Sequence, residues 1–262
     1  MSVLKVDKIA DRQYTGEEFK PEVTIRDGNT VLTKDTHYTV VGYTDNTLPG
    51  TAKIVIKGVE EEGYVGKMTV TFRILAIPIR KTVITGPADC DFSGIKQVPE
   101  PVVKYNGTEL EKDADYKLIY DRNENAGKAR VTISGIGGYT GSVSKTFTIR
   151  PADIDTAAIT LDGEAPYEYP YVKSGVKPAV TVKLYDIPLK EGKDYTLKFT
   201  GNTAITTDST TKLPTVTITG KGNLKGKKDM TFKITKSPIN NCKIVTDVVL
   251  YTPRPGNWKT KP

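Results

Sequence analysis

One pattern of residues occurs three times along the 262 residues of this chain. Each copy has an aromatic residue, a proline, a leucine, an aspartate-tyrosine step, an asparagine, a glycine-rich turn and a Phe-x-Ile ending. The first copy is marked by Tyr14, Pro21, Leu32, Asp35, Tyr38, Asn46, Tyr64 and residues 72–74. The second is marked by Phe92, Pro101, Leu110, Asp113, Tyr116, Asn123, Tyr139 and residues 147–149. The third is marked by Tyr171, Pro178, Leu189, Asp194, Tyr195, Asn202, residues 220–226 and residues 232–234. The prolines lie 80 and 77 residues apart.

A period near 80 residues indicates an array of small domains, because each copy has the size of a small folding unit. We predict repeats at residues 1–76, 77–150 and 151–236. Residues 237–262 are predicted to be the start of a truncated fourth repeat or a C-terminal cap. Both ends of the sequence are expected to be cut from a longer protein.

The second copy shows most clearly how one repeat folds. Residues 102–105 form a predicted strand that ends at Asn106-Gly107, which is a signal for a two-residue hairpin turn. Asp27-Gly28 is expected to be the same turn in the first copy. Residues 116–120, 128–133 and 144–149 alternate apolar and polar residues, as half-buried strands do.

These strands predict an all-β chain, a tandem array of small immunoglobulin-like β-sandwich domains. Turn signals every 8–12 residues and the lack of a helical period favour this fold. The alternative is a set of β-grasp-like repeats, which would require a helix of about ten residues that the pattern does not offer. The copies follow one another through a single proline without a Gly/Ser linker, so we expect the joints to be semi-rigid.

The ordered markers resemble the tandem bacterial Ig-like repeats of Gram-positive cell-surface proteins and are distantly similar to the MBG/YDG-type repeats of large adhesins. The resemblance extends from residue 3 to about residue 236. It implies an extracellular location at the bacterial surface or cell wall and a role as stalk, spacer or adhesive module, without an active site. The third copy departs most, because Asn223-Leu224 stands where the pattern has Gly-Tyr.

The residue inventory argues against catalysis. His37 is the only histidine, so histidine-based metal clusters and Ser-His-Asp sites are not expected. Cys90 and Cys242 lie at non-equivalent positions of the repeat, which favours free thiols over a disulfide framework. We therefore predict no enzyme, no catalytic or metal-binding residues and no cofactor.

Aspartates precede the strand tyrosine of each copy and offer two interpretations. Asp35, Asp113, Asp115 and Asp194 carry the oxygen ligands that Ca²⁺ prefers. Aspartates in turns also bond to nearby backbone groups, and their recurrence in every copy favours this structural role. His37 stands where the other copies have Asp115 and Asp194.

Ligand binding is expected where one copy differs from the others. The third copy opens with several tyrosines and carries a long threonine-rich loop, and exposed tyrosine rings can stack on sugars. The possible ligand-binding residues are Tyr167, Tyr169, Thr206, Thr207 and Asp208. Packing of the tyrosines and a tolerated loop insertion are the structural alternatives.

The predicted function is a non-catalytic extracellular spacer or stalk that presents neighbouring domains. The alternative is an adhesin module that binds a glycan or a host surface protein through the third repeat. Polysaccharide, mucin or a host surface protein are the partners considered. The net charge of +7 is mild for three domains, so neither nucleic acid binding nor membrane insertion is expected, and we predict a monomer.

Overall fold

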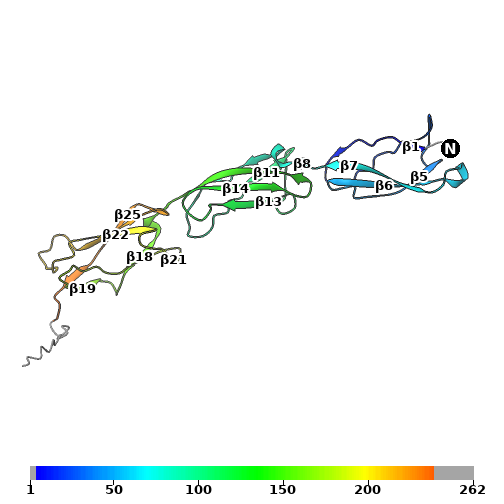
Figure 1. The fold of residues 1–262 in the computed structure, drawn as a ribbon. Helices are drawn as coiled ribbons and strands as arrows, with labels where there is room; N and C mark the ends of the chain where they lie inside the picture. The colour runs from blue at the N-terminus through cyan, green and yellow to red at the C-terminus, as the bar shows by residue number, and fades with distance from the viewer. Residues whose placement is uncertain (1–3, 239–262) are drawn as a thin grey trace, which may run out of the picture. The chain divides into compact units, whose positions relative to one another are not determined.

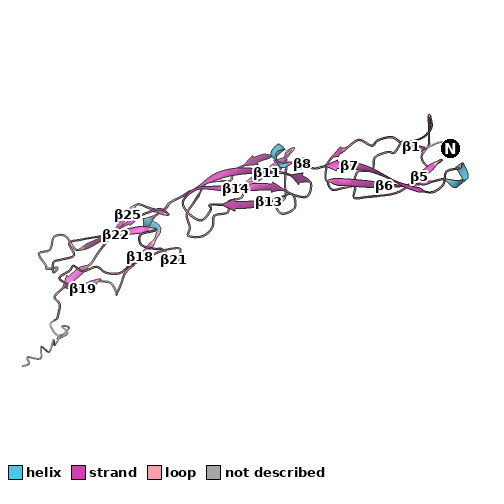
Figure 2. Ribbon diagram, in the orientation of Figure 1, coloured by secondary structure: helices cyan, strands magenta, loops and turns pink. Residues whose placement is uncertain are grey.

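The computed structural model describes residues 4–238, which form strands and turns. The only helical segments in that range are three-residue 3-10 turns, coloured cyan in Figure 2: η1 (Glu60–Glu62), η2 (Ile79–Lys81) and η3 (Ile154–Thr156). The predicted all-β class, a tandem array of β-sandwich domains, is confirmed. The β-grasp alternative is wrong for the described range, because it requires a longer helix. No helix within residues 4–238 has the length and apolar character needed to cross a bilayer.

The chain divides into two compact units. The first comprises Met1–Thr156 and Gly220–Lys225, and the second comprises Ala157–Thr219 and Gly226–Pro262. The first unit therefore holds both of the first two copies of the pattern. The predicted fourth repeat or cap lies, from residue 239 on, outside the described residues.

The first copy folds as two sheets that enclose a core. One sheet has four strands in the order β2 (Arg12–Gln13), β7 (Lys67–Leu75), β6 (Gly50–Gly58) and β5 (Tyr38–Thr44). The other has three strands in the order β1 (Leu4–Val6), β3 (Ile25–Asp27) and β4 (Thr30–Val31). In Figure 1, β5, β6 and β7 run side by side. Ala52, Ile54 and Ile56 alternate along β6 and are buried, as their spacing predicts.

The second copy repeats both sheets in the same order. Its four-stranded sheet comprises β10 (Cys90–Asp91), β16 (Ser142–Arg150), β14 (Gly127–Gly135) and β13 (Tyr116–Asp121). Its three-stranded sheet comprises β12 (Thr108–Glu109), β11 (Val102–Tyr105) and β9 (Val83–Thr85). A short parallel pair is added by β8 (Ile77–Pro78) and β15 (Tyr139–Thr140). The corresponding pair after the second copy is β17 (Ala152–Asp153) with β24 (Leu224–Lys225).

The second compact unit contains most of the third copy. One sheet comprises β18 (Ala158–Leu161), β20 (Val180–Leu184) and β21 (Ile187–Pro188). Another comprises β22 (Tyr195–Thr200), β23 (Thr215–Gly220) and β25 (Lys227–Thr231). A parallel pair is formed by β19 (Glu168–Pro170) and β26 (Lys233–Thr235). Val216 and Ile218 are fully buried, at the positions that match Ile54 and Ile56.

In each copy, an asparagine in the loop after β5, β13 or β22 bonds to the backbone of the loop that precedes β3, β11 or β20. Its side-chain amide donates to a main-chain carbonyl at 2.7–2.9 Å, and its own carbonyl accepts from the N–H of that same residue at 2.8 Å. The pairs are Asn46 with Phe19, Asn123 with Gln97, and Asn202 with Val176. Buried amides require such partners, which explains why asparagine recurs at this position.

The asparagine pairs also correct the alignment of the proline markers. Residues two positions after each bonded partner are equivalent, and these are Pro21, Pro99 and Pro178. The assignment of Pro101 to this set is wrong, because Pro101 instead matches Val23. The second copy has prolines at both positions, and only the tertiary hydrogen bonds distinguish them.

One hairpin turn lies a residue away from its predicted place. Asn106 and Gly107 have φ of 48° and 87° and join paired residues of β11 and β12, as a type I′ turn does. In the first copy Asp27 still belongs to β3 and pairs with Thr30, so the turn residues are the two that follow Asp27. The Asp-Gly dipeptide resembled the Asn-Gly signal, but the strand register decides which residues turn.

Candidate functional site

The two predicted tyrosines of the third copy are built into its fold. The ring of Tyr169 packs edge-on against Phe232, with centroids 5.7 Å apart, and its hydroxyl donates to the carbonyl oxygen of Asp162. Burial raises the pKa of Tyr169 to about 12, since the ionised form is disfavoured there. Tyr167 is half-buried, and its carbonyl accepts from the N–H of Lys233 at 2.9 Å. Tyr169 therefore has the packing role that was the structural alternative to ligand binding.

Thr206, in the threonine-rich loop, is hydrogen-bonded to the backbone of Ile234. Its N–H donates to the carbonyl of Ile234 at 2.8 Å, and its hydroxyl oxygen accepts from the N–H of Ile234 at 3.0 Å. In the first two copies the residue equivalent to Ile234 pairs with a glycine that begins the neighbouring strand, Gly50 or Gly127. The loop insertion displaces that strand start, and Thr206 replaces its hydrogen bonds.

Thr207 and Asp208 form the exposed tip of the same loop. The Thr207 hydroxyl lies 2.9 Å from that of Ser209 and 3.3 Å from that of Thr210. Ile234 is paired with Tyr169 and is hydrogen-bonded to the loop through Thr206, so the fold brings the two predicted clusters to one strand, β26. Ligand binding at these residues stays a prediction.

Two of the four aspartates considered for calcium bond to the backbone through their side chains, as the structural alternative predicts. Asp115 accepts the N–H of Glu111, and Asp194 accepts the N–H of Lys190, both at 2.9 Å. In the first copy the Nδ1 atom of His37 accepts the equivalent N–H at 2.8 Å. Across residues 4–238 no three acidic, histidine or cysteine side chains lie close enough together to hold a metal ion.

Tyr14 belongs to two cores, a role that the sequence pattern did not reveal. It packs against the buried cluster of the first copy and against that of the second, where its ring meets Tyr139 edge-on at 6.1 Å. A Cβ atom at Gly138 would lie 1.8 Å from the Tyr14 ring, so glycine is needed there to admit it. Burial raises the pKa of Tyr139 to about 12. The second glycine of Gly137-Gly138 is the sequence feature that could have indicated this close contact.

Asn223 stands at the position of Gly138 in the later copy and makes polar contacts instead. Its side-chain oxygen accepts the N–H of Ala126 at 2.8 Å, and its amide donates to the side-chain oxygen of Asn125 at 3.0 Å. These contacts lie within the first compact unit, to which Gly220–Lys225 belongs. The departure of Asn223-Leu224 from the Gly-Tyr pattern thus exchanges an aromatic contact for hydrogen bonds.

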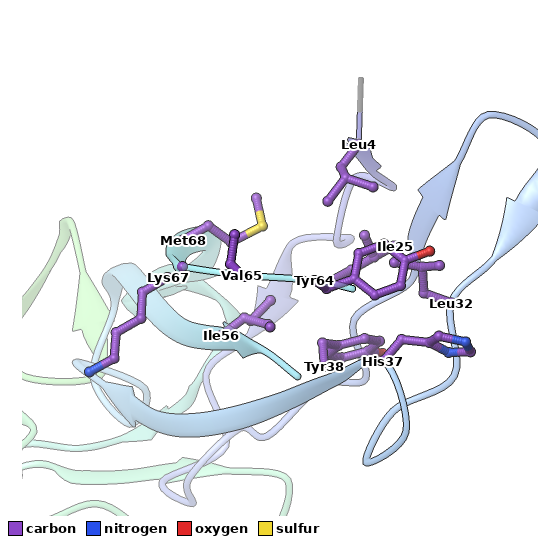
Figure 3. Close-up of a pocket in the computed structure, with 12 residues that line it drawn as sticks. Leu4, Ile25, Leu32, His37, Tyr38, Ile56, Tyr64, Val65, Lys67 and Met68 are labelled. Atoms are coloured by element: carbon purple, nitrogen blue, oxygen red, sulfur yellow. The ribbon is translucent and has the colours of Figure 1, made fainter. Parts of the chain in front are cut away.

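An apolar pocket of about 280 Å³ opens at one end of the first copy (Figure 3). Its wall includes Leu32, Tyr38 and Tyr64. Its rim includes Val65 and Met68, which are 77% and 38% exposed. Sequence reasoning missed this pocket, because its wall residues are ordinary core positions of the repeat.

Of the two cysteines, the structure describes Cys90 alone. Cys90 is half-buried in β10, and burial raises the pKa of its thiol, which disfavours the reactive thiolate. Cys242 lies outside the described residues.

No protein-family model and no curated protein matches this chain. Among solved structures, S-layer protein SbsC domains 7, 8 and 9 is 13% identical over 82% of this chain and 91% of that chain, with a TM-score of 0.25. PcdhgB3 EC1-4 is 14% identical over 87% of this chain and 74% of that chain, with a TM-score of 0.22. The structure of SbsC domains 4-9 is 14% identical over 89% of this chain and 48% of that chain, with a TM-score of 0.19. Similarity at this level supports no assignment of function.

Proposed function

We propose that the chain is a non-catalytic extracellular spacer, which holds neighbouring domains of a surface protein apart. The observation that carries this proposal is the sharing of Tyr14 between the cores of the first two copies. A side chain packed into both cores couples two domains directly, because moving one would expose or displace the ring. A joint of this kind fixes the position of one domain relative to the next, as a spacer requires.

The recurring polar residues support the same proposal. The asparagine pairs and the Asp or His turn contacts each satisfy backbone groups within their own copy. Residues that recur for folding reasons leave little of the repeated pattern for chemistry. The bacterial cell surface remains the proposed location.

The spacer proposal predicts one fixed distance between the first two copies. Spin labels on Thr51→Cys and Lys128→Cys, in a background without Cys90 and Cys242, should give a narrow distance distribution by pulsed electron resonance. Both labelled side chains are exposed, so the labels should not disturb packing. Tyr14→Ala should broaden the distribution. A broad distribution in the otherwise unaltered protein would contradict the proposal.

The second candidate function is binding of a glycan or host surface protein through the third copy. It is favoured by the exposure of Thr207 and Asp208 on a loop that the first two copies lack. Retention on immobilised polysaccharides and mucin should then be lost in the Thr207→Ala/Asp208→Ala protein. Glu124→Ala, in the short loop of the second copy, is the matched control and should bind normally. Absence of retention on every surface would remove this candidate.

A further inference from the structure

Another pocket lies inside the first compact unit, where residues of the first copy meet residues of the second. Its volume is about 420 Å³, within the range of roughly 300–1,000 Å³ that small-ligand sites occupy. The first copy supplies residues 13–15, and the second supplies residues of the β11–β12 hairpin and Tyr139. The pocket therefore exists only where the two copies are packed together.

Three tyrosines line this pocket, which we call the tyrosine pocket: Tyr14, Tyr105 and Tyr139. The ring of Tyr139 meets those of Tyr14 and Tyr105 edge-on, with centroids 6.1 and 6.0 Å apart. Tyr139 is 9% exposed, whereas Tyr14 and Tyr105 are half-buried and keep part of their surface accessible. The cluster thus combines apolar ring surface with three polar tips.

The hydroxyls of these three tyrosines have no partner in the fold. Elsewhere in the unit, the hydroxyls of Tyr38 and Tyr120 donate to main-chain carbonyls. Within residues 4–238, no hydrogen bond is made by the hydroxyl of Tyr14, Tyr105 or Tyr139. Since no buried side-chain oxygen or nitrogen of the described range lacks a partner, these hydroxyls are accessible from outside the fold.

Packing alone does not require a tyrosine at any of the three positions. In the next copy, the equivalents of Tyr14, Tyr105 and Tyr139 are Phe92, Leu184 and Leu224. All three replacements are buried and carry no polar atom in their side chains. The repeat accepts apolar residues here, so a hydroxyl at all three positions of one pocket points to a polar ligand.

Uncharged polar side chains complete the lining, and all of them are exposed: Gln13, Thr15, Asn106 and Thr108. The side-chain amide of Gln13 donates to the carbonyl of Leu75 at 2.7 Å, which fixes its orientation and leaves its carbonyl oxygen as an acceptor. The Thr15 hydroxyl oxygen accepts the N–H of Glu17 at 3.3 Å, so its own hydrogen can be donated. The pocket therefore offers both donors and acceptors.

The charge of the lining restricts the class of ligand. Among the described residues that line the tyrosine pocket there is no Asp, Glu, Lys or Arg. A charged ligand would lose hydration there without gaining a counter-charge. Burial raises the pKa of Tyr139 to about 12, so its hydroxyl keeps its proton at neutral pH. A neutral sugar fits these conditions, because its C–H faces stack on aromatic rings while its hydroxyls bond to uncharged polar groups.

We propose that the tyrosine pocket binds a neutral sugar unit of a polysaccharide. Tyr105 and Tyr14 supply the stacking surface, and Gln13 and Thr108 bond to the sugar hydroxyls. Because both copies form the pocket, the bound sugar also stabilises their joint. The inference goes beyond the spacer function, and the site is separate from the third-copy loop of the second candidate function.

Affinity electrophoresis of the full chain, in gels that contain mannan, dextran or β-1,3-glucan, tests the proposal. At least one of these neutral polysaccharides should retard the protein. Tyr105→Phe keeps the ring and should weaken binding about fivefold, the typical effect of one lost hydrogen bond. Tyr105→Ala also removes the stacking surface and should weaken binding by at least about tenfold. Tyr185→Ala, at a tyrosine of the third copy that is 70% exposed, is the matched control and should bind normally.

The Thr207→Ala/Asp208→Ala protein separates this site from the loop of the third copy, and it should be retarded as strongly as the unaltered protein. Thermal unfolding would verify that Tyr105→Phe is folded, since its packing is preserved. Migration unaffected by all three polysaccharides would overturn the proposal, as would equal retardation of the Tyr105→Ala and unaltered proteins. Retardation that is lost only with the loop variant would assign sugar binding to the third copy and also overturn it.

Discussion

The first and second copies are built from the same sheets, yet they differ at one end of the sandwich. In the second copy, Ile77 and Ile79 close the core, and they come from the segment that directly follows the first copy. In the first copy the described residues leave an apolar pocket at this end, and the position equivalent to Ile79 falls at residue 1, outside the described range. The core of the second copy is therefore completed by the segment that precedes its first strand, β9.

The largest expected effect comes from truncating Ile79 in the core of the second copy. Ile79→Ala should lower the free energy of unfolding of the second copy by about 2–5 kcal/mol, because it deletes a fully buried aliphatic side chain. Denaturant unfolding followed by hydrogen exchange at buried positions such as Val131 would locate the loss. Truncation at the rim of the first copy's pocket, Met68→Ala, should cost less than about 0.5 kcal/mol since Met68 is partly exposed. Equal losses of unfolding free energy for Ile79→Ala and Met68→Ala would contradict this comparison.

The next effect concerns the glycine that admits Tyr14. Gly138→Ala should destabilise the first unit by about 1–3 kcal/mol, because the new methyl group would overlap the Tyr14 ring. In a Tyr14→Ala background the same change should cost much less, and a double-mutant cycle in thermal or denaturant unfolding measures this coupling. Additive effects would mean that the ring does not occupy the space above Gly138.

A smaller effect is expected at the polar counterpart of that contact. Asn223→Ala should cost about 1 kcal/mol, the typical value of a part-buried hydrogen bond, because the Ala126 N–H loses its acceptor. Faster hydrogen exchange at Ala126 would report the loss locally. Asn223→Asp keeps an acceptor oxygen and should protect Ala126 better than alanine does.

The smallest effect is expected where copies use different residues for one task. His37→Asp should change the free energy of unfolding by less than about 0.5 kcal/mol, because Asp115 and Asp194 accept the equivalent N–H. His37→Ala should cost more, since the Thr33 N–H then lacks its acceptor. Thermal unfolding of the two variants side by side would check the order, and equal losses would contradict it.

Much of the fold could be predicted from local sequence. Alternation placed Ala129, Val131 and Ile133 on one buried face, and all three are fully buried. The Asn-Gly signal located the hairpin turn of the second copy. These features depend on residues close in the chain, whose backbone preferences are visible without knowledge of the partner strands.

The candidate site was less predictable. The sequence singled out Tyr169 and Thr206 because they differ between copies, but it could not show that Phe232 packs on one and that Ile234 bonds to the other. It also could not show the pocket of the first copy, because wall residues such as Leu32 and Tyr38 are core positions of the repeat pattern. Exposure at one end of a sandwich depends on which other segment reaches it.

The sequence by itself determined that this protein is an array of repeated all-β units, because strand alternation, turn residues and a period near 80 residues are all local or periodic properties. Only the tertiary structure decided that Pro99, and not Pro101, matches Pro21, and that Tyr14 serves two cores through the space left by Gly138. Those outcomes depend on which distant residues meet and on how closely side chains pack, and neither is written in the order of neighbouring residues.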